Sequence, residues 1–251
     1  MSTNITNLAD RYERDGFLVV DPLLSTGTVQ RLRQRTGEIA DGQTGFPVES
    51  IGLEPGAASV SLATVRKLNN CALHDDVFRA HADHPDILDI VESLIGPDIK
   101  LFDAQLFMKP PGGIEKTYHQ DSAYFPLAPQ EVVTCWTAMD DVTIENGCMY
   151  VIPGSHRSGI LNHDQPWVVG DRKDMQVPDA LIPWEQEVPL TLSAGGCSFH
   201  HGILLHRSGA NTTSTSRRGL AVHYISGSVR WIDMKKPAPE FPVLRGRDTA
   251  D

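Results

Sequence analysis

Apolar and polar positions follow two different rhythms along the chain, and the rhythm changes near residue 99. Within residues 26–41 and 84–95, apolar side chains recur every three or four positions, which predicts amphipathic helices. Ser25 or Thr26 is a suitable N-cap for the first of these helices. The side chains expected on its buried face are Val29, Leu32 and Ile39.

Two shorter segments complete the prediction for the first hundred residues. Residues 4–15 predict a short helix, which leads into a first strand over residues 17–20 that ends at Asp21-Pro22. Residues 41–63 are rich in glycine, proline and serine and predict a long loop. Long loops in compact domains often serve as functional lids.

From residue 99 onward the chain has the pattern of a β protein. Short apolar runs alternate with clusters of turn-forming residues, a spacing typical of an all-β sandwich or barrel. The predicted strands are 99–108, 132–139, 148–152, 188–192, 196–199, 202–206 and 219–225. Helical patterns lie mainly in the first hundred residues. We therefore expect a mainly β protein with helices packed outside the β core, and a single domain over residues 1–251.

Charge and composition exclude several classes of protein. The 251 residues carry a formal net charge of −10, which repels phosphate backbones and anionic lipid surfaces. Neither nucleic acid nor a membrane is therefore an expected partner. No run of roughly 18 apolar residues is present to span a bilayer, and the N-terminus lacks the pattern of a secretory signal. These features favour a cytoplasmic protein, and they leave its oligomeric state open.

The cysteines do not form a recognisable framework. No pair has the CxxC spacing of a zinc or redox motif, and four cysteines in a chain of this length do not indicate a disulfide framework. We expect them to be buried, reduced thiols. They are Cys71, Cys135, Cys148 and Cys197.

The first candidate for chemistry is the His-x-Asp spacing of His119 and Asp121. Two residues apart on a strand, an imidazole and a carboxylate point to the same face and can bind one metal ion. By itself the spacing is weak evidence, because it occurs by chance in many proteins. A third ligand is required. Two histidines and one carboxylate on one face of an octahedron are typical of non-haem iron(II) oxygenases.

The C-terminal β region offers a third ligand and an anchor for a carboxylate. His206 ends an apolar run, where the alternative interpretation is a hydrogen-bonded histidine at a strand end. Arg217 opens a strand-like segment. An arginine that points into a β core needs an anionic partner, such as the carboxylate of a co-substrate. Arg217 and Arg218 cannot both point inward from one strand.

Together with other short motifs, these residues make the chain resemble the phytanoyl-CoA dioxygenase family of iron(II)- and 2-oxoglutarate-dependent oxygenases, over about residues 10–230. An ordered series of matches is far more specific than His-x-Asp alone. The matching pieces are Asp15-Gly16-Phe17, Lys109-Pro110-Pro111-Gly112, His119-Gln120-Asp121, Cys135-Trp136-Thr137-Ala138-Met139, Asn146-Gly147-Cys148, Ile152-Pro153-Gly154-Ser155-His156, and His206-x-Ser208 with Asn211 and Arg217.

The resemblance implies a fold and a set of roles. The implied fold is a double-stranded β-helix, a jelly roll of cupin type, with flanking helices. The implied iron ligands are His119, Asp121 and His206. Arg217 corresponds to the arginine that pairs with the distal carboxylate of 2-oxoglutarate, so Arg218 is expected to point outward. The further residues expected at the co-substrate pocket are Ser208, Trp136, Lys109 and Gln105.

The resemblance also implies the reaction. It is oxidation of an unactivated C–H bond in a small-molecule metabolite by O₂, with 2-oxoglutarate converted to succinate and CO₂. Related halogenases lack the carboxylate ligand, so Asp121 favours hydroxylation. A zinc hydrolase or isomerase on the same barrel is the first alternative, and Arg217 argues against it because a hydrolase needs no co-substrate anchor. A non-catalytic binding module is the second, and the complete triad argues against it.

Several residues near the motifs have other interpretations. His200, His201 and His223 are close to the ligand candidates, and His201 is expected either to be structural or to support a metal ligand without binding the metal. His156 and His163 lie in or near loops and are expected to be solvated, and Asp140-Asp141 is expected to be a turn. Aromatic side chains at Tyr124 and Phe125 are equally compatible with a pocket wall and with the core.

The substrate is expected to be set by the segments with the least pattern, which are residues 41–63, 122–130 and 157–187. The chain ends in Asp248-Thr249-Ala250-Asp251, which is not a peroxisomal signal. This ending argues against a peroxisomal phytanoyl-CoA role and favours another small-molecule metabolite.

Overall fold

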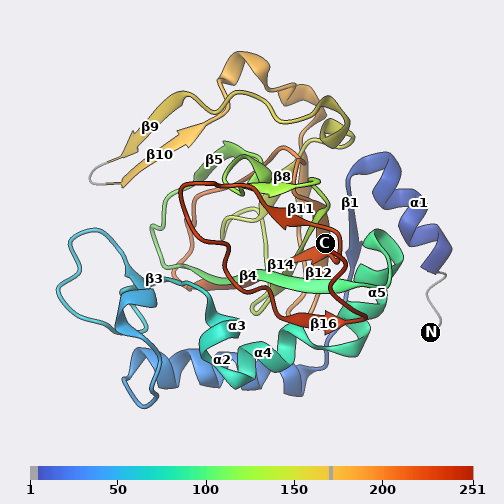
Figure 1. Cartoon of the computed structure of the whole chain (residues 1–251). Helices are drawn as coiled ribbons and strands as arrows, with labels where there is room; N and C mark the ends of the chain where they lie inside the picture. The colour runs from blue at the N-terminus through green and yellow to red at the C-terminus, as the bar shows by residue number, and fades with distance from the viewer. Residues whose placement is uncertain (1–4, 170–171, 251) are drawn as a thin grey trace.

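Two antiparallel sheets occupy the middle of the computed structural model, which describes residues 5–169 and 172–250 (Figure 1). The larger sheet has the strand order β1-β12-β7-β14-β4-β3-β2, with β16 beside β4. Its strands are β1 (Phe17–Val20), β2 (Ile51–Leu53), β3 (Val65–Leu68), β4 (Ile99–Lys109), β7 (Val132–Ala138), β12 (Cys197–His201), β14 (Arg217–Ser226) and β16 (Val243–Arg245).

The smaller sheet has the order β11-β8-β13-β5. Its strands are β5 (Lys116–His119), β8 (Met149–Val151), β11 (Val188–Leu190) and β13 (His206–Ser208). Two short pairs complete the β structure, and they are β6 (Leu127–Ala128) with β15 (Arg230–Trp231), and β9 (Gln165–Val169) with β10 (Arg172–Gln176).

Helices cover the outside of the β structure. In Figure 1, α2, α3 and α4 lie along one side, α1 and α5 lie together at the adjoining end, and the β9–β10 hairpin extends on the opposite side. The α-helices are α1 (Ile5–Asp15), α2 (Thr26–Ala40), α3 (Cys71–His74), α4 (Asp76–Ala82) and α5 (Pro85–Ile95). The 3₁₀ helices are η1 (Val48–Ser50), η2 (Asp121–Ala123), η3 (Ser155–Ser158), η4 (Asp179–Leu181) and η5 (Trp184–Gln186).

Alternation along the strands of the larger sheet separates two apolar cores. On β14, Leu220 and Val222 pack into the core beneath the helices, whereas Ala221 packs into the core between the sheets. On β7, Cys135 and Trp136 divide in the same way. Because side chains alternate with period two, one face of each strand remains available to line a cavity between the sheets. The two facing sheets form the expected jelly roll, with helices outside it.

Most of the expected elements are confirmed. Ser25 caps α2 by accepting a hydrogen bond from the Thr28 amide, and Val29, Leu32 and Ile39 are buried. The four cysteines are free and buried, as predicted. No helix within the described residues is long and apolar enough to cross a membrane.

Two predicted elements are wrong, and several are missed. Residues 202–205 turn instead of forming a strand, because the Leu204 amide donates back to the His201 carbonyl, and β13 begins only at His206. The predicted loop 41–63 contains η1 and β2. The missed α3 and α4 are short, so their apolar residues do not repeat often enough to show a period. Phe78 of α4 is nonetheless fully buried.

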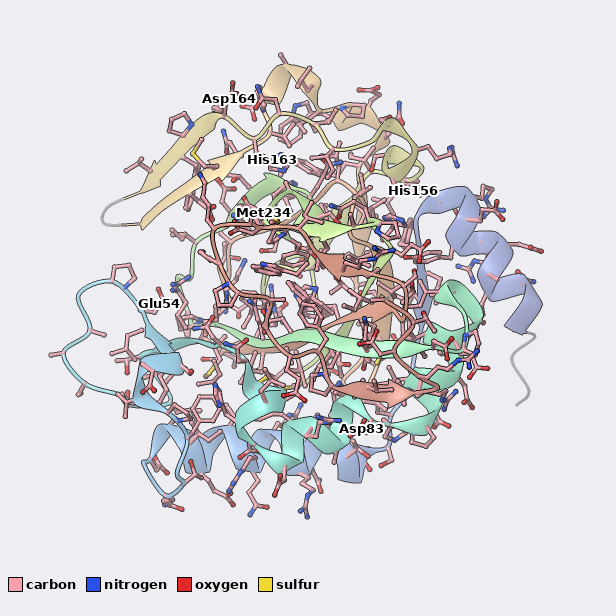
Figure 2. The ribbon with its side chains drawn as sticks, viewed as in Figure 1. Glu54, Asp83, His156, His163, Asp164 and Met234 are labelled. Carbon is pink, nitrogen blue, oxygen red and sulfur yellow. The ribbon has the colours of Figure 1, made fainter. Side chains whose placement is uncertain are left out.

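The segment between β15 and β16 crosses in front of the sheets in the view of Figure 1 and returns the chain to the β4 edge. Figure 2 places Met234 on this segment, and the residue is 96% exposed. Phe241 near the end of the segment packs against Phe102, with ring centroids 5.6 Å apart. This aromatic contact and β16 attach the C-terminal part to the larger sheet.

Candidate metal centre and active site

Cross-strand pairing brings two of the candidate ligands together. His119 ends β5 and is the direct partner of His206, which begins β13. Both rings therefore face the same side of the smaller sheet, with centroids 4.2 Å apart. The chain then turns into η2, which starts at Asp121 and directs its carboxylate back toward the rings. Oδ1 of Asp121 lies 3.7 Å from Nε2 of His119 and 3.5 Å from Nε2 of His206.

The two histidines are held in the form that binds a metal. Nδ1 of His119 donates to the Thr117 carbonyl at 2.8 Å, and Nδ1 of His206 donates to the Leu204 carbonyl at 3.0 Å. A carbonyl only accepts, so each Nδ1 carries the hydrogen and each Nε2 keeps a free lone pair. Burial lowers the pKa of His206 to about 4 and that of His119 well below its usual value. Both rings are neutral at physiological pH.

Hydrogen bonds to one oxygen hold the Asp121 carboxylate in its orientation. Its Oδ2 accepts hydrogen bonds from Oγ1 of Thr134 at 3.0 Å and from Nε2 of His200 at 3.3 Å. Thr134 is paired in register with His200 on β12 and with His223 on β14. Because the threonine hydrogen goes to the carboxylate, Nδ1 of His223 donates to Thr134 at 2.8 Å. This arrangement leaves Oδ1 free to face a metal ion.

Opposing effects act on the charge of Asp121. Burial raises its pKa, but the attraction of His206 and the hydrogen bond from His200 outweigh burial and hold the pKa well below its usual value. The carboxylate is therefore ionised and balances part of the charge of a divalent cation. Within the described residues, His119, Asp121 and His206 are the only group whose ligand atoms, all within 4.8 Å of one another, can hold a metal ion.

Gln120, the residue between His119 and Asp121, is also held in place by hydrogen bonds. Gln120 is fully buried, and its amide nitrogen donates to the carbonyls of Gly159 (2.9 Å) and Ile203 (2.7 Å). Its amide oxygen accepts from the Leu161 N–H, and its backbone N–H donates to Nε2 of His163 at 3.0 Å. The expectation that His163 is solvated is therefore wrong, because its ring holds the backbone between the ligands. Figure 2 labels His163 in the loop between η3 and β9.

Arg217 is a buried cation without a carboxylate partner among the described residues. Its side chain is 3% exposed, one terminal nitrogen donates to the Gly147 carbonyl, and its Nε has no hydrogen-bond partner. Burial lowers the pKa of Arg217 to about 10, so it stays charged. An unpaired buried guanidinium is costly, whereas a carboxylate can fill its free donor positions. These groups therefore fit the distal carboxylate of 2-oxoglutarate.

A tryptophan and a glycine shape the space next to Arg217. The guanidinium carbon lies 5.2 Å from the centroid of the Trp136 ring, within the range of a cation–π contact. Trp136 in turn lies over Gly219 of β14, where a Cβ atom would overlap its six-membered ring. Gly219 thus allows Trp136 to lie flat against the sheet beside the arginine.

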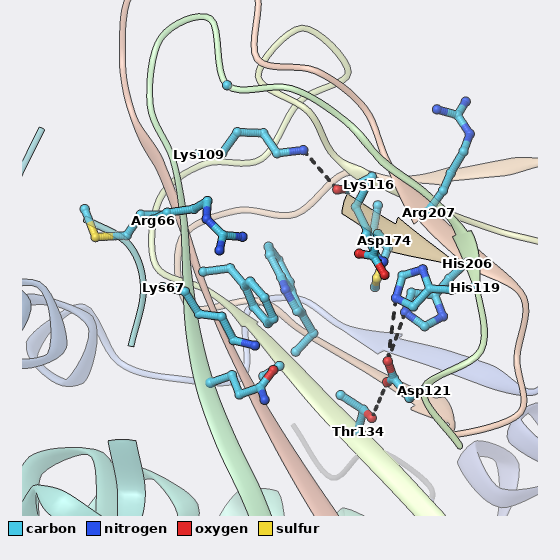
Figure 3. Close-up of a pocket in the computed structure, with 18 of the residues that line it drawn as sticks. Arg66, Lys67, Lys109, Lys116, His119, Asp121, Thr134, Asp174, His206 and Arg207 are labelled. Carbon is cyan, nitrogen blue, oxygen red and sulfur yellow. Dashed lines mark hydrogen bonds and ion pairs between the residues drawn. The ribbon is translucent and has the colours of Figure 1, made fainter. Parts of the chain in front are cut away.

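The remaining co-substrate candidates meet in the same cavity. Nζ of Lys109 donates to Oγ of Ser208 at 2.9 Å and also to the Gly209 carbonyl. Gln105 lines the cavity as well, but its amide nitrogen donates to Asp103 at 2.6 Å. The structure thus brings all eight predicted site residues to one cavity of about 440 Å³ between the sheets (Figure 3).

All three segments expected to set the substrate reach this cavity. Glu54 comes from residues 41–63, Tyr124 and Phe125 come from residues 122–130, and Asp174 comes from residues 157–187. Nothing in the sequence pointed to Arg66 of β3, because this strand was not predicted. His200, Thr134 and His223 were not chosen either. For His223 a signal existed, since it lies on the same face of β14 as Arg217.

Several other residues near the site make contacts within the protein. Arg218 faces away from the cavity and binds Asp140 through two hydrogen bonds of 2.8 and 2.7 Å. Asp140 lies in a bend after β7, at the predicted turn. Nδ1 of His201 accepts from the Ile203 N–H at 3.1 Å, which is a structural role. His156 is partly buried and contacts the Glu13 carbonyl at 3.0 Å, so its expected solvation is wrong.

A two-sheet jelly roll that gathers two neutral histidines, one aspartate and an unpaired arginine defines a non-haem iron oxygenase that uses 2-oxoglutarate as co-substrate. The family model "Phytanoyl-CoA dioxygenase (PhyH)" matches residues 12–219, and the chain belongs to this family. The peroxisomal phytanoyl-CoA dioxygenases of Rattus norvegicus and Homo sapiens are each 31% identical to it over 252 residues, covering 96% of this chain and 74% of the relative.

Solved structures agree with this assignment. The non-haem monooxygenase ThoJ superimposes with a TM-score of 0.78 at 28% identity, covering 96% of this chain and 85% of that one. The epimerase SnoN, in complex with Fe³⁺, alpha ketoglutarate and nogalamycin RO, gives 0.74 at 26% identity, covering 96% and 98%. The protein is therefore a 2-oxoglutarate-dependent enzyme whose cofactors are iron and 2-oxoglutarate, with O₂ as oxidant. The comparisons do not favour a zinc hydrolase.

Proposed function

We propose that this enzyme hydroxylates an unactivated C–H bond of a small-molecule metabolite, with His119, Asp121 and His206 as the iron ligands and Arg217 as the anchor of 2-oxoglutarate. The observation that carries the proposal is the meeting of these four side chains in one cavity. Three of them present metal-binding atoms, and the fourth is a buried cation with no carboxylate partner in the part of the chain that the structure describes.

Iron and 2-oxoglutarate, when bound, supply the oxidising chemistry, in which O₂ is reduced, 2-oxoglutarate is converted to succinate and CO₂, and one oxygen atom passes to the substrate. The residues of the chain supply binding and orientation. Nε2 of each histidine and Oδ1 of Asp121 face one point, while Thr134 and His200 keep the carboxylate from turning. Trp136 lies beside Arg217, which is buried.

The carboxylate at Asp121 also favours hydroxylation over halogenation, because it fills the coordination position that a halide would require. A different outcome on this fold has a named example, since SnoN is described as an epimerase. Mass analysis of the organic product separates these reactions. Hydroxylation adds one oxygen atom, whereas epimerisation leaves the mass unchanged.

The ligand assignment is tested by Asp121→Ala. Without this carboxylate, the iron loses its only anionic protein ligand, and we expect both iron binding and succinate formation to fall to background. Asp164→Ala is a matched control, because Asp164 is exposed in a loop and its carboxylate accepts a hydrogen bond from Asn162 outside the site. Undiminished succinate formation by the Asp121 variant would reject the assignment.

We also propose that residues 1–251 act as a single oxygenase domain. In support, one apolar core joins side chains of the N-terminal helices, such as Leu32 and Phe78, to Leu106 and Val222 of the central strands. A single cooperative thermal transition, with the same midpoint by fluorescence and circular dichroism, is the expected result. Two separated transitions would contradict it.

We further propose that the enzyme works in the cytoplasm. Four buried free thiols are compatible with a reducing compartment, whereas the rat and human relatives are named as peroxisomal. Cell fractionation with an antibody to the protein tests this location. Recovery of the protein in the peroxisomal fraction would overturn the proposal.

A further inference from the structure

One ring nitrogen of His223 offers a hydrogen-bond acceptor to the cavity. Nδ1 of His223 donates to Oγ1 of Thr134, which in turn donates to Asp121, and Figure 3 marks this second contact with a dashed line. Nε2 of His223 has no hydrogen-bond partner among the described residues, although the residue is only 3% exposed. His223 lines the cavity, so this nitrogen is available to a bound ligand.

The surrounding hydrogen bonds make Nε2 an acceptor and not a donor. Thr134 has a single hydroxyl hydrogen, which goes to Asp121 because a carboxylate only accepts. His223 must therefore supply the hydrogen of its own contact with Thr134 from Nδ1. Burial lowers the pKa of His223, against the attraction of Asp121 and Asp103, so the ring is neutral at neutral pH. A neutral imidazole has one N–H hydrogen, which leaves a lone pair on Nε2.

Packing keeps the His223 ring in this orientation. His223 is the direct partner of Asp103 on β4, and the register shifts immediately after it, so that Phe102 is left without a partner among the described residues of β14. Such bulges often direct side chains beside active sites. Phe102 packs against Phe125, and the Phe125 and His223 rings lie at 73° to each other with centroids 5.1 Å apart. The ring is therefore held by an aromatic contact as well as by Thr134.

The neighbouring polar side chain in the cavity also offers an acceptor. Gln105 lies on β4 opposite Ala221, on the same face as Asp103. Its amide nitrogen donates to the Asp103 carboxylate at 2.6 Å, which directs its amide oxygen elsewhere. No described residue donates a hydrogen bond to this oxygen. His223 and Gln105 thus add two acceptors to the same part of the cavity wall.

An acceptor of this kind discriminates between substrates. Water can bond to Nε2 of His223 until a ligand displaces it. A ligand group that covers Nε2 without supplying a hydrogen leaves a buried acceptor unpaired, which weakens binding. A group with an O–H or N–H bond replaces the lost hydrogen bond and avoids this cost.

We propose that His223 is a substrate-binding residue whose Nε2 accepts a hydrogen bond from a hydroxyl or amino group of the substrate. This inference rests on the proposed function, since it assigns the substrate class of the same site. Nδ1 of His223 lies 3.9 Å from Oδ2 of Asp121, so the donor group is held close to the metal ligands. Phe107 and Phe125 also line the cavity and suit a carbon skeleton beside that group. The substrate is a metabolite with a hydroxyl or amino group and an apolar portion.

The test compares hexan-1-ol and hexylamine, which have donor hydrogens, with methyl pentyl ether, an isomer of hexan-1-ol that has none. Each is titrated calorimetrically, without oxygen, into the full-length protein loaded with saturating iron(II) and 2-oxoglutarate. We expect the alcohol, the amine or both to bind at least about fivefold more tightly than the ether, because the ether leaves Nε2 unpaired. The preferred donor distinguishes a hydroxyl substrate from an amino one.

Variants of His223 locate the effect. His223→Phe removes the acceptor and is expected to abolish the preference for the donor ligand over the ether. His223→Gln is expected to restore part of the preference, because its amide can donate to Thr134 and still offer an oxygen to the ligand. A purely structural role of His223 would weaken the alcohol and the ether equally, so the ratio of their affinities is the decisive value. His74→Phe is the matched control, since His74 is exposed on α3 outside the cavity.

The visible absorption band formed when iron(II) binds a 2-oxo acid separates failure of this inference from failure of the proposed function. If the wild-type protein forms no such band, the proposed function fails, and the inference fails with it. If the band forms but the ether binds as well as the alcohol and the amine, or none of the ligands binds, only the role of His223 is overturned. Retention of the wild-type preference in His223→Phe would overturn it as well.

Discussion

The floor of the cavity and its mouth differ in how far their polar side chains are paired within the protein. The floor lies around Asp121. There, Thr134 and His200 donate hydrogen bonds to the carboxylate, and His223 donates one to Thr134. At the mouth, Arg66 and Lys67 are partly exposed and lack carboxylate partners among the described residues. The floor is thus organised by hydrogen bonds within the protein, whereas the side chains at the mouth are less constrained.

This difference explains why the two regions should respond differently to mutation. A group that is buried and satisfied has no alternative partner when one member is removed, because water cannot reach it. A partly exposed group at the mouth recovers much of the lost interaction from solvent.

The largest effect is expected at Arg217, the buried cation beside the floor. Arg217→Met should raise the KM for 2-oxoglutarate by about a hundredfold, because the distal carboxylate is left buried without a partner. Arg218→Met is the control, since Arg218 faces the other side of β14 and binds Asp140. Steady-state kinetics with 2-oxoglutarate as the varied substrate give both values. A similar rise of KM in the two variants would mean that the loss of one positive charge, and not the position of Arg217, weakens 2-oxoglutarate binding.

Removal of the Thr134 hydroxyl, which takes part in two hydrogen bonds at the floor, should have the next largest effect. Thr134→Val keeps the shape of the side chain but removes the donor to Asp121 and leaves the His223 N–H without its acceptor. We expect iron affinity to fall by about ten- to a hundredfold, as is typical when a partner of a metal ligand is lost. Thr134→Ser retains the hydroxyl and should retain most of the affinity. Equilibrium metal competition provides the measurement, and an unchanged affinity in the valine variant would contradict it.

A smaller effect is expected where packing, and not hydrogen bonding, supports the floor. Gly219→Ala places a methyl group into the space filled by the Trp136 ring and should destabilise the protein by about 1–3 kcal/mol. The displaced ring should also raise the KM for 2-oxoglutarate. Gly37→Ala serves as a control, because Gly37 of α2 has open space around its Cα. Denaturant unfolding compares the two. Equal stability of the Gly219 variant and the wild type would refute the packing argument.

The smallest effect is expected at the mouth. Asp174→Asn removes the ion pair with Lys116 and weakens the contact with the Tyr124 hydroxyl, which also donates to the Met175 carbonyl at 2.9 Å. Both groups are partly exposed, so we expect less than about a fivefold change in substrate KM and no change in iron affinity. A loss of iron binding in this variant would show that mouth and floor are coupled.

The sequence by itself determined the chemistry and the fold class. His119, Asp121, His206 and Arg217 could be chosen because family motifs mark them, and alternation along one strand then implied that Arg218 points outward. The change from helical to strand rhythm near residue 99 likewise predicted a β core with outer helices. The error at residues 202–205 arose because an apolar run reads as a strand even where the backbone turns.

Only the tertiary structure decided what surrounds these residues. Thr134 lies between His200 and His223 because β7 pairs with both β12 and β14, strands that are remote in sequence. Arg66 and Lys67 reach the cavity because β3 pairs with β4. Such neighbours are set by strand register, which depends on the burial of whole sheet faces and on turns elsewhere in the chain. Strand register cannot be predicted from a local sequence pattern. The partners of Asp121 and the cations at the mouth are therefore known only from the assembled sheets.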